Sequence, residues 1–152
     1  MGSSSEEATS SSATSSSATS PSKVTATPIG GATLGEFKAK GDGIQVESGP
    51  GSADVALVKV VLEPGGSTGW HHHPGVALVS VKSGAVSEYH EECYKTVYKE
   101  GKGFLESGGE VHIVRNEGNV DAVLYVMFLI PTGTPPEKLQ IADSQPKNCE
   151  VK

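Results

Sequence analysis

Short apolar runs separated by glycine and proline constrain the fold of this chain more than any other feature. The two clearest runs, residues 54–63 and 122–130, have the composition and length of buried strands, and Pro64 and Pro131 follow them directly. About nine such segments occur at short spacing, and no convincing amphipathic helix interrupts them. The pattern predicts an all-β fold, either a β-sandwich or a closed barrel, with a cavity between its sheets.

The predicted strands cover residues 34–40, 43–47, 54–63, 76–82, 85–90, 93–99, 104–106, 111–116 and 122–130. A turn at Gly41 and Asp42 is expected to join the first two strands into a hairpin. After Pro131 the sequence has no strong periodicity, so we expect this last part to wrap around the outside of the fold.

The first part of the chain has a different composition from the rest. Residues 1–28 are low in complexity, and the segment 10–14 is repeated at 15–19. Such a segment has too little apolar surface to offset the entropy lost on ordering. We therefore predict a disordered Ser/Thr-rich tail over residues 1–28 and a single domain over residues 29–152.

The charge of the chain excludes one large class of function. The formal net charge is −6, and Arg115 is the only arginine, so no basic stripe exists that could follow a nucleic-acid backbone. No apolar run approaches the roughly 18 residues of a membrane-spanning helix. We expect neither a nucleic-acid partner nor a transmembrane segment.

Two cysteines, Cys93 and Cys149, form either one disulfide or two separate thiols. Residues 1–20 lack the basic start and apolar core of a secretory signal, which fits a cytoplasmic protein and equally a mature exported one. Ser/Thr-rich tethers often hold exported domains away from a surface. We favour the disulfide, and an extracellular or cell-envelope location over a cytoplasmic one.

Three consecutive histidines, residues 71–73, are the main candidate for chemistry. In an extended chain His71 and His73 point to one face, and His72 points to the other. Two imidazoles on one face form part of a metal site, and His112, near the start of another predicted strand, is the candidate third ligand. A lone His112 would more often be an ordinary hydrogen-bonded residue.

The spacing around these histidines resembles the two motifs of the cupin superfamily. In the first motif, Gly65, His71, His73 and Gly84 fall in register, and Ala77 stands where a glutamate is expected. In the second motif, the matching residues are Gly101, Gly109, His112 and Asn116, with Ser107 in place of a proline. The resemblance covers residues 33–131. It implies a double-stranded β-helix, or jelly-roll barrel, with His71, His73 and His112 as metal ligands and Asn116 as a structural residue.

The departure at Ala77 leads us to predict a three-histidine site without a carboxylate, similar to those of cysteine dioxygenase and of the diketone-cleaving dioxygenases. Three neutral imidazoles leave a divalent ion with its full charge, which favours an anionic or chelating substrate. Nitrogen ligands suit Fe, Ni, Cu, Zn or Co and disfavour Mg and Ca.

Two functions from different classes follow. The first is a small-molecule metalloenzyme, either a dioxygenase-like oxidoreductase or a Lewis-acid isomerase or lyase. The second is a non-catalytic cupin that holds a metal or a small ligand. The resemblance also implies that a homodimer is possible.

Several other side chains are weaker candidates. Glu110 shares the strand face of His112 and could act as an acid, a base or a ligand, although carboxylates beside a Gly-Gly turn are usually solvated. Trp70 is expected to face away from the histidine pair, and Arg115 to lie at the rim or on the surface. Ser107 has no base in a recognisable hydrolase motif, so we predict no nucleophile triad.

Overall fold

The computed structural model describes residues 18–152, and the predicted disorder of residues 1–17 lies outside this part. The described chain is all-β, apart from one short 3₁₀ turn, η1 (Pro136–Lys138), and the predicted fold class is confirmed. The strands are β1 (Ser22–Gly35), β2 (Lys38–Gly41), β3 (Ile44–Glu47), β4 (Ala53–Ser67), β5 (His71–His72), β6 (Val76–Ser83), β7 (Ala85–His90), β8 (Lys95–Lys99), β9 (Gly103–Glu106), β10 (His112–Arg115), β11 (Ala122–Pro131) and β12 (Ile141–Ala142).

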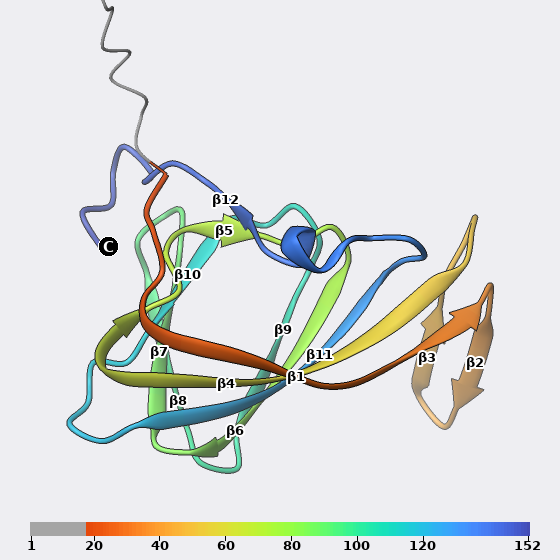
Figure 1. Ribbon diagram of the computed structural model, residues 1–152, viewed down its shortest axis with the longest axis horizontal. Helices are drawn as coiled ribbons and strands as arrows, with labels where there is room; N and C mark the ends of the chain where they lie inside the picture. The colour runs from red at the N-terminus through yellow and green to blue at the C-terminus, as the bar shows by residue number, and fades with distance from the viewer. Residues whose placement is uncertain (1–17) are drawn as a thin grey trace, which may run out of the picture.

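The strands curl into a nearly closed barrel (Figure 1). The longest hydrogen-bonded path runs β12-β5-β10-β4-β11-β6-β9, with β1 on β4 and with β7 and β8 continuing from β10. Buried and exposed residues alternate along β6 and β11, so that Val79, Val126 and Phe128 face the interior. This alternation fills the barrel with apolar side chains, as the period of two in a strand requires.

The predicted strand ends at residue 63, directly before Pro64. In the structure, β4 continues through Pro64, Gly65 and Gly66. Gly65 has a φ of +81°, and a Cβ on Gly66 would lie 2.6 Å from the carbonyl oxygen of Lys23. Glycine therefore lets the strand bend close to β1 instead of ending it.

Strand β1 begins at Ser22, within the segment 1–28 that was predicted as a tail, and pairs with β4 along nearly its whole length. Residues 22–28 are mostly exposed, so this part of the strand could not be predicted from apolar residues. Backbone hydrogen bonds to β4 hold it in place, and amino-acid composition does not reveal such pairing.

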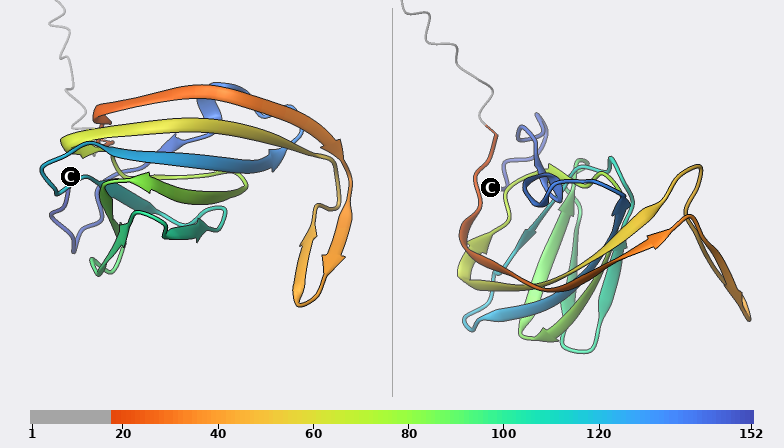
Figure 2. Two further views of the ribbon diagram at one scale, coloured as in Figure 1. Left: turned by 90° about the horizontal axis from the view of Figure 1, so that it is seen from below. Right: turned by 45° about the vertical axis from the view of Figure 1, so that its right-hand side comes forward.

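Strands β2 and β3 form the predicted hairpin, but its turn is at Asp42 and Gly43, one residue later than predicted, and its first strand begins at Lys38 because residues 34–35 belong to β1. It connects the ends of β1 and β4 and stands away from the barrel (Figure 2). We call residues 38–47 the arm. All residues of its two strands are exposed.

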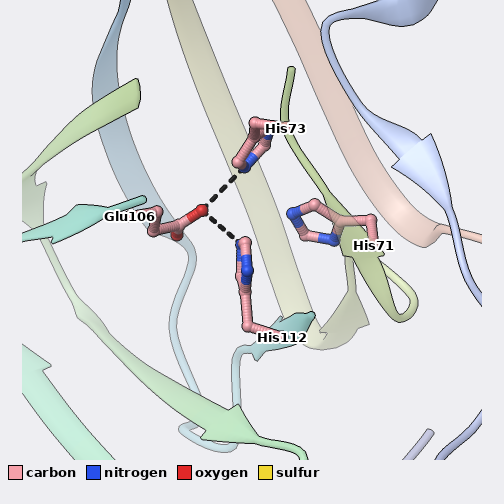
Figure 3. Close-up of side chains that lie close together, drawn as sticks. All are labelled: His71, His73, Glu106 and His112. Carbon is pink, nitrogen blue, oxygen red and sulfur yellow. Dashed lines mark hydrogen bonds and ion pairs between the residues drawn. The ribbon is translucent and has the colours of Figure 1, made fainter. Parts of the chain in front are cut away.

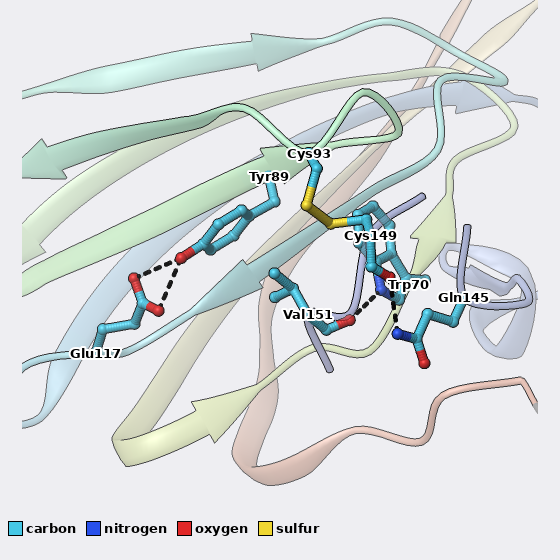
Figure 4. The surroundings of a disulfide bond; sticks show 7 residues. All are labelled: Trp70, Tyr89, Cys93, Glu117, Gln145, Cys149 and Val151. Atoms are coloured by element: carbon cyan, nitrogen blue, oxygen red, sulfur yellow. Dashed lines mark hydrogen bonds between the residues drawn. A yellow bond between two sulfur atoms is a disulfide. The ribbon is translucent and has the colours of Figure 1, made fainter. Parts of the chain in front are cut away.

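A second, smaller core lies outside the barrel interior and contains Trp70, Tyr89, Ile113 and Cys149 (Figure 4). The predicted disulfide joins Cys93 to Cys149, with 5.1 Å between their Cα atoms. Residues 139–151, which we call the C-terminal strap, pass over β5 and end in this core, where the indole Nε1 of Trp70 donates a hydrogen bond to the carbonyl of Val151. Within the described residues, no helix has the length and apolar character needed to cross a membrane.

Candidate metal centre

The three candidate histidines meet inside the barrel, although they come from two distant parts of the chain (Figure 3). His71 begins β5, His73 follows it, and His112 begins β10, where it pairs directly with His71. Their side chains are almost completely buried, and one ligand atom from each lies within 4.8 Å of the others and of a carboxylate oxygen of Glu106. The predicted convergence of these three side chains is therefore present.

Glu106 is the residue that the sequence prediction missed as part of the site. It ends β9 and lies directly opposite Ala77 in the ladder between β6 and β9. The carboxylate that the motif places at residue 77 thus comes from the neighbouring strand. The predicted group held three histidines and no carboxylate; the structure adds Glu106 to it, because pairing between β6 and β9 brings in a side chain that no local pattern marks as a candidate ligand.

Backbone carbonyls orient all three imidazoles in the same way. The Nδ1 atoms of His71, His73 and His112 lie 2.8, 2.7 and 2.9 Å from the carbonyl oxygens of Gly69, Leu139 and Glu110. A carbonyl can only accept, so each Nδ1 carries a proton. In the neutral ring each Nε2 then presents a lone pair, and this is the arrangement of histidines that bind metals.

The Nε2 atoms of His73 and His112 both face the Oε2 atom of Glu106, at 2.7 Å for His73 and in close contact for His112. Two lone pairs and a carboxylate oxygen repel one another unless extra protons or a cation balance them. Extra protons would place imidazolium ions where the side chains of His112 and His73 are only 0% and 4% exposed. A divalent cation balances the same atoms while keeping the imidazoles neutral, so this donor set fits a metal.

The pKa values follow from burial and from these contacts. Burial, assisted by the charges of His112 and His73, lowers the pKa of His71 to about 3, so this ring is neutral at physiological pH. Burial opposes ionisation of Glu106, but contacts with His112 and His73 hold its pKa well below the usual range. Burial likewise opposes a charged His112, and contact with Glu106 nevertheless raises its pKa.

Beside the donors lies a small chamber of about 50 Å³. Apart from the donors His71, His73 and Glu106, it is lined by Val60, Thr68, Ala77, Val79, Phe104, Val114, Leu124, Val126, Phe128 and Gln140. Among the described residues, no lysine or arginine lines it. The chamber therefore offers an apolar surface for the body of a ligand and the donor group for its polar end.

Glu110 is not part of the donor group. It lies 2.9 Å from Nδ1 of His90, whose Nε2 lies 3.0 Å from the buried Glu88. Burial, followed by the charge of Glu106, raises the pKa of Glu88 to about 7. The cluster of Glu88, His90 and Glu110 is a second polar group in the barrel wall, and the sequence pattern did not mark Glu88 or His90.

Three further predictions about single residues agree with the structure. His72 points away from the donors and lies 2.7 Å from Asp143 through its Nδ1. Trp70 is fully buried in the second core, away from the barrel interior. Asn116 is structural, as expected: its amide donates hydrogen bonds to the carbonyls of Leu62 and Val120.

Comparison with known proteins shows what this geometry is similar to. Residues 58–128 match the family model described as a cupin domain, and this stretch contains all four donor residues. Over these residues the chain is similar to the cupin domain. A search of curated proteins gives no match.

Two solved cupin structures share the fold. A cupin superfamily protein from Desulfitobacterium hafniense is 12% identical, with a TM-score of 0.50 over 70% of this chain and 77% of that one. A cupin 2 conserved barrel domain protein from Leptotrichia buccalis is 16% identical, with a TM-score of 0.50 over 70% of this chain and 41% of that one. An oxalate oxidase in complex with glycolate is 24% identical, with a TM-score of 0.46 over 51% of this chain, which spans 42% of the oxidase. At these identities, the two structures with a TM-score of 0.50 show a shared fold and nothing further.

Proposed function

We propose that this protein binds one divalent transition metal through Nε2 of His71, His73 and His112 and the carboxylate of Glu106. The observation that carries the proposal is the orientation of the rings: every Nδ1 faces a backbone carbonyl, so every Nε2 presents a lone pair to the same buried point. An ordinary cluster of buried histidines has no reason to share this orientation.

The four donor side chains favour a group of transition metals and do not select one of them. Three imidazole nitrogens suit Fe, Co, Ni, Cu or Zn, and the carboxylate of Glu106 adds Mn to this range. Glu106 also cancels part of the charge of a bound dication, so the centre attracts anions less strongly than a three-histidine centre does.

We propose that the metal centre acts on a small molecule. Centres built from histidine and carboxylate with open positions are typical of non-haem iron oxygenases, and this supports a dioxygenase-like reaction. A bound metal would supply Lewis-acid chemistry or, in the case of iron, redox chemistry with dioxygen. The chain itself would orient the substrate, with Phe104 and Phe128 packing against an apolar body and the donors facing its one or two oxygen or sulfur atoms.

A non-catalytic binding function is the second candidate. One observation favours it: beyond the donors, the polar residues lining the chamber are Thr68 and Gln140, neither of which is an acid or a base at neutral pH. In this case the barrel would hold the metal, or a small ligand on it, without turnover.

The first experiment is metal analysis of protein purified without added metal, together with Co²⁺ titration of the metal-free protein followed by visible absorption. We expect one metal per chain, and loss of binding in His112→Ala. The matched control is His72→Ala, which removes the neighbouring outward histidine and should bind Co²⁺ like the wild type. Unchanged binding in His112→Ala would overturn the site.

Catalysis needs a separate measurement. Oxygen uptake by the iron-loaded protein with a panel of diketones, thiols and flavonols would support the dioxygenase-like reaction if it disappears in His112→Ala. Metal binding without uptake or turnover of any member would favour the binding function.

We also propose that the protein works outside the cytoplasm, in an extracellular or cell-envelope location. The disulfide between Cys93 and Cys149 supports this, because such bonds persist in oxidising compartments. Immunodetection in the medium, envelope and cytosol fractions of the native host tests this proposal. The homodimer that the sequence resemblance implies is likewise a proposal, which sedimentation equilibrium of the full chain tests.

A further inference from the structure

Two successive layers of side chains bound the chamber beside the donors. Each layer contains one residue from each of the neighbouring strands β11, β6 and β9. The donor layer consists of Phe128, Ala77 and Glu106. The second layer, two residues away on each strand, consists of Val126, Val79 and Phe104. Alternate residues of a strand are about 7 Å apart, so the second layer closes the chamber a short distance from Glu106.

Aromatic rings limit the width and the depth of this chamber. In the donor layer, the ring of Phe128 meets the ring of His73 edge to face, with 5.2 Å between their centroids. In the second layer, the ring of Phe104 stacks on the ring of Tyr98, with 4.4 Å between their centroids. Both phenylalanines are buried, and close packing keeps such rings in place.

The volume of the chamber restricts the size of a ligand. It is about 50 Å³, whereas pockets for drug-sized molecules have volumes of about 300 to 1,000 Å³. The space lies against Ala77, whose methyl group is the smallest side chain of the two layers. A ligand in this chamber therefore has a short body, and a planar ring would overlap the phenylalanines.

The charges around the chamber restrict the charge of a ligand. Glu106 cancels one of the two positive charges of a bound dication. Among the described residues that line the chamber, the polar ones beyond the donors are Thr68 and Gln140, which carry no charge. The hydroxyl of Thr68 donates its only proton to the carbonyl of Gly69, and Nε2 of Gln140 donates to the carbonyl of Thr68. A second negative charge on a ligand would thus be buried without a partner, which is costly.

Given the proposed metal site, on which this inference rests, we propose that the chamber takes a small chelating monoanion with a short aliphatic body. The two polar atoms of this ligand face the metal, and its body occupies the space beside Ala77. Phe104 and Phe128 determine the specificity, because their rings exclude a longer or aromatic body. Of the candidate substrates named above, small diketones and thiols fit this class, and the three-ring flavonols do not.

Visible absorption of the Co²⁺-loaded protein tests the proposal, because a ligand that coordinates the cobalt ion changes its absorption bands. Acetohydroxamate and benzohydroxamate chelate through the same two oxygen atoms with the same charge, and differ only in a methyl group or a phenyl ring. We expect the wild type to bind acetohydroxamate about tenfold more tightly or better. Oxalate, which is similar in size to acetohydroxamate but doubly charged, should bind about tenfold more weakly than acetohydroxamate. Cobalt analysis after gel filtration shows that the metal stays on the protein.

Phe104→Ala should remove the preference, so that the two hydroxamates bind within about threefold of each other. Phe37→Ala is the matched control, because it removes the same side chain from a residue that does not line the chamber, and it should keep the wild-type ratio. Ala77→Val fills part of the chamber and should weaken acetohydroxamate binding by about tenfold, while cobalt stays bound. Circular dichroism shows that each variant is folded, and neither the wild-type ratio nor the Ala77→Val result depends on the Phe104 variant.

Equal affinity of the wild type for the two hydroxamates would overturn the size limit, and so would a preference that Phe104→Ala leaves unchanged. Oxalate binding as tight as that of acetohydroxamate would overturn the charge limit. A wild type that takes up no Co²⁺ would contradict the proposed metal site itself. Cobalt binding without selectivity would contradict only the ligand class, so the two failures are distinguishable.

Discussion

Glu106 and Ala77 face each other across one residue pair of the ladder between β6 and β9. The motif expects the carboxylate at the position of Ala77, and the structure supplies it from Glu106. Residues opposite each other in an antiparallel pair have Cβ atoms about 5 Å apart, which a glutamate side chain can span. The same point in the barrel is therefore reached from either strand.

The first prediction tests whether a carboxylate at residue 77 can replace the one at residue 106. Glu106→Ala should weaken Co²⁺ binding by about 10- to 100-fold, because it removes the only carboxylate of the donor group. Adding Ala77→Glu to this variant should restore most of the loss, since the new carboxylate enters the volume that Glu106 vacates. Titration followed by visible absorption measures both. A double variant that binds no better than Glu106→Ala would show that the two positions are not equivalent.

The second prediction concerns the pH dependence of stability. The pKa of Glu88 is raised to about 7 in the folded chain, chiefly by burial, from an ordinary value of 4.5. The folded state therefore holds a proton between about pH 4.5 and 7 that the unfolded state has lost, and the stabilisation from this proton disappears as the pH rises through 7. In the metal-free protein, Glu88→Gln should be more stable than the wild type above pH 8, by about 1 to 3 kcal/mol.

Urea unfolding of the metal-free proteins at pH 5 and pH 8.5 measures this difference. Glutamine keeps an oxygen that can accept the hydrogen bond from His90, so the comparison isolates the charge. The gain in stability should be much smaller at pH 5. A difference between the two proteins that is the same at both pH values would contradict the assignment.

At the scale of elements, the C-terminal strap does more than wrap around the barrel. Its Leu139 carbonyl orients His73, its β12 pairs with β5, and Asp143 contacts both His72 and the backbone of Trp70. The disulfide at Cys149 fixes the far end of the strap. The segment that carries two of the four donors, His71 in β5 and His73 just after it, is therefore held in place by the last residues of the chain.

The third prediction is that Cys149→Ser loosens the strap and weakens the metal site. Loss of the bond, which closes a loop with a sequence separation of 56, should lower the free energy of unfolding by about 2 to 4 kcal/mol. Co²⁺ affinity should fall several-fold, because His73 is then oriented less firmly. Denaturant unfolding and Co²⁺ titration measure the two effects, and Cys93→Ser should reproduce both. Full affinity in both serine variants would show that the strap does not organise the site.

At the scale of the whole molecule, the barrel brings its donors together only when it is folded. The donors belong to three separate strand regions, so the unfolded chain has no comparable site. The fourth prediction is that Co²⁺ at about 100 times its dissociation constant stabilises the fold by about 2.7 kcal/mol. This should raise the thermal midpoint by several degrees. Differential scanning calorimetry with and without a chelator measures the shift, which should vanish in His112→Ala. An unchanged midpoint in the wild type would contradict metal binding.

Much of the element pattern could be predicted because it is local. The strand at residues 85–90 was predicted with its observed bounds, and those at 76–82 and 122–130 differ from β6 and β11 by one residue at one end. Strand β1 was largely missed because it is exposed and has little apolar content, and β12 because it is short. The period of two in β-branched runs marks strands that bury one face. It does not detect strands that are held mainly by backbone pairing.

The sequence by itself determined which residue types are available to the site and that two of them share a strand face. His71 and His73 lie on one face, His112 is the third histidine, and residue 77 is not a carboxylate. The sequence also allowed only one disulfide, because the chain has two cysteines. The tertiary structure alone decided which strands are neighbours, and so it placed Glu106 opposite Ala77, the strap over β5 and the arm outside the barrel. The physical reason is that periodicity reports which way a side chain points along its own strand, whereas a site forms between strands whose pairing depends on the packing of the whole barrel.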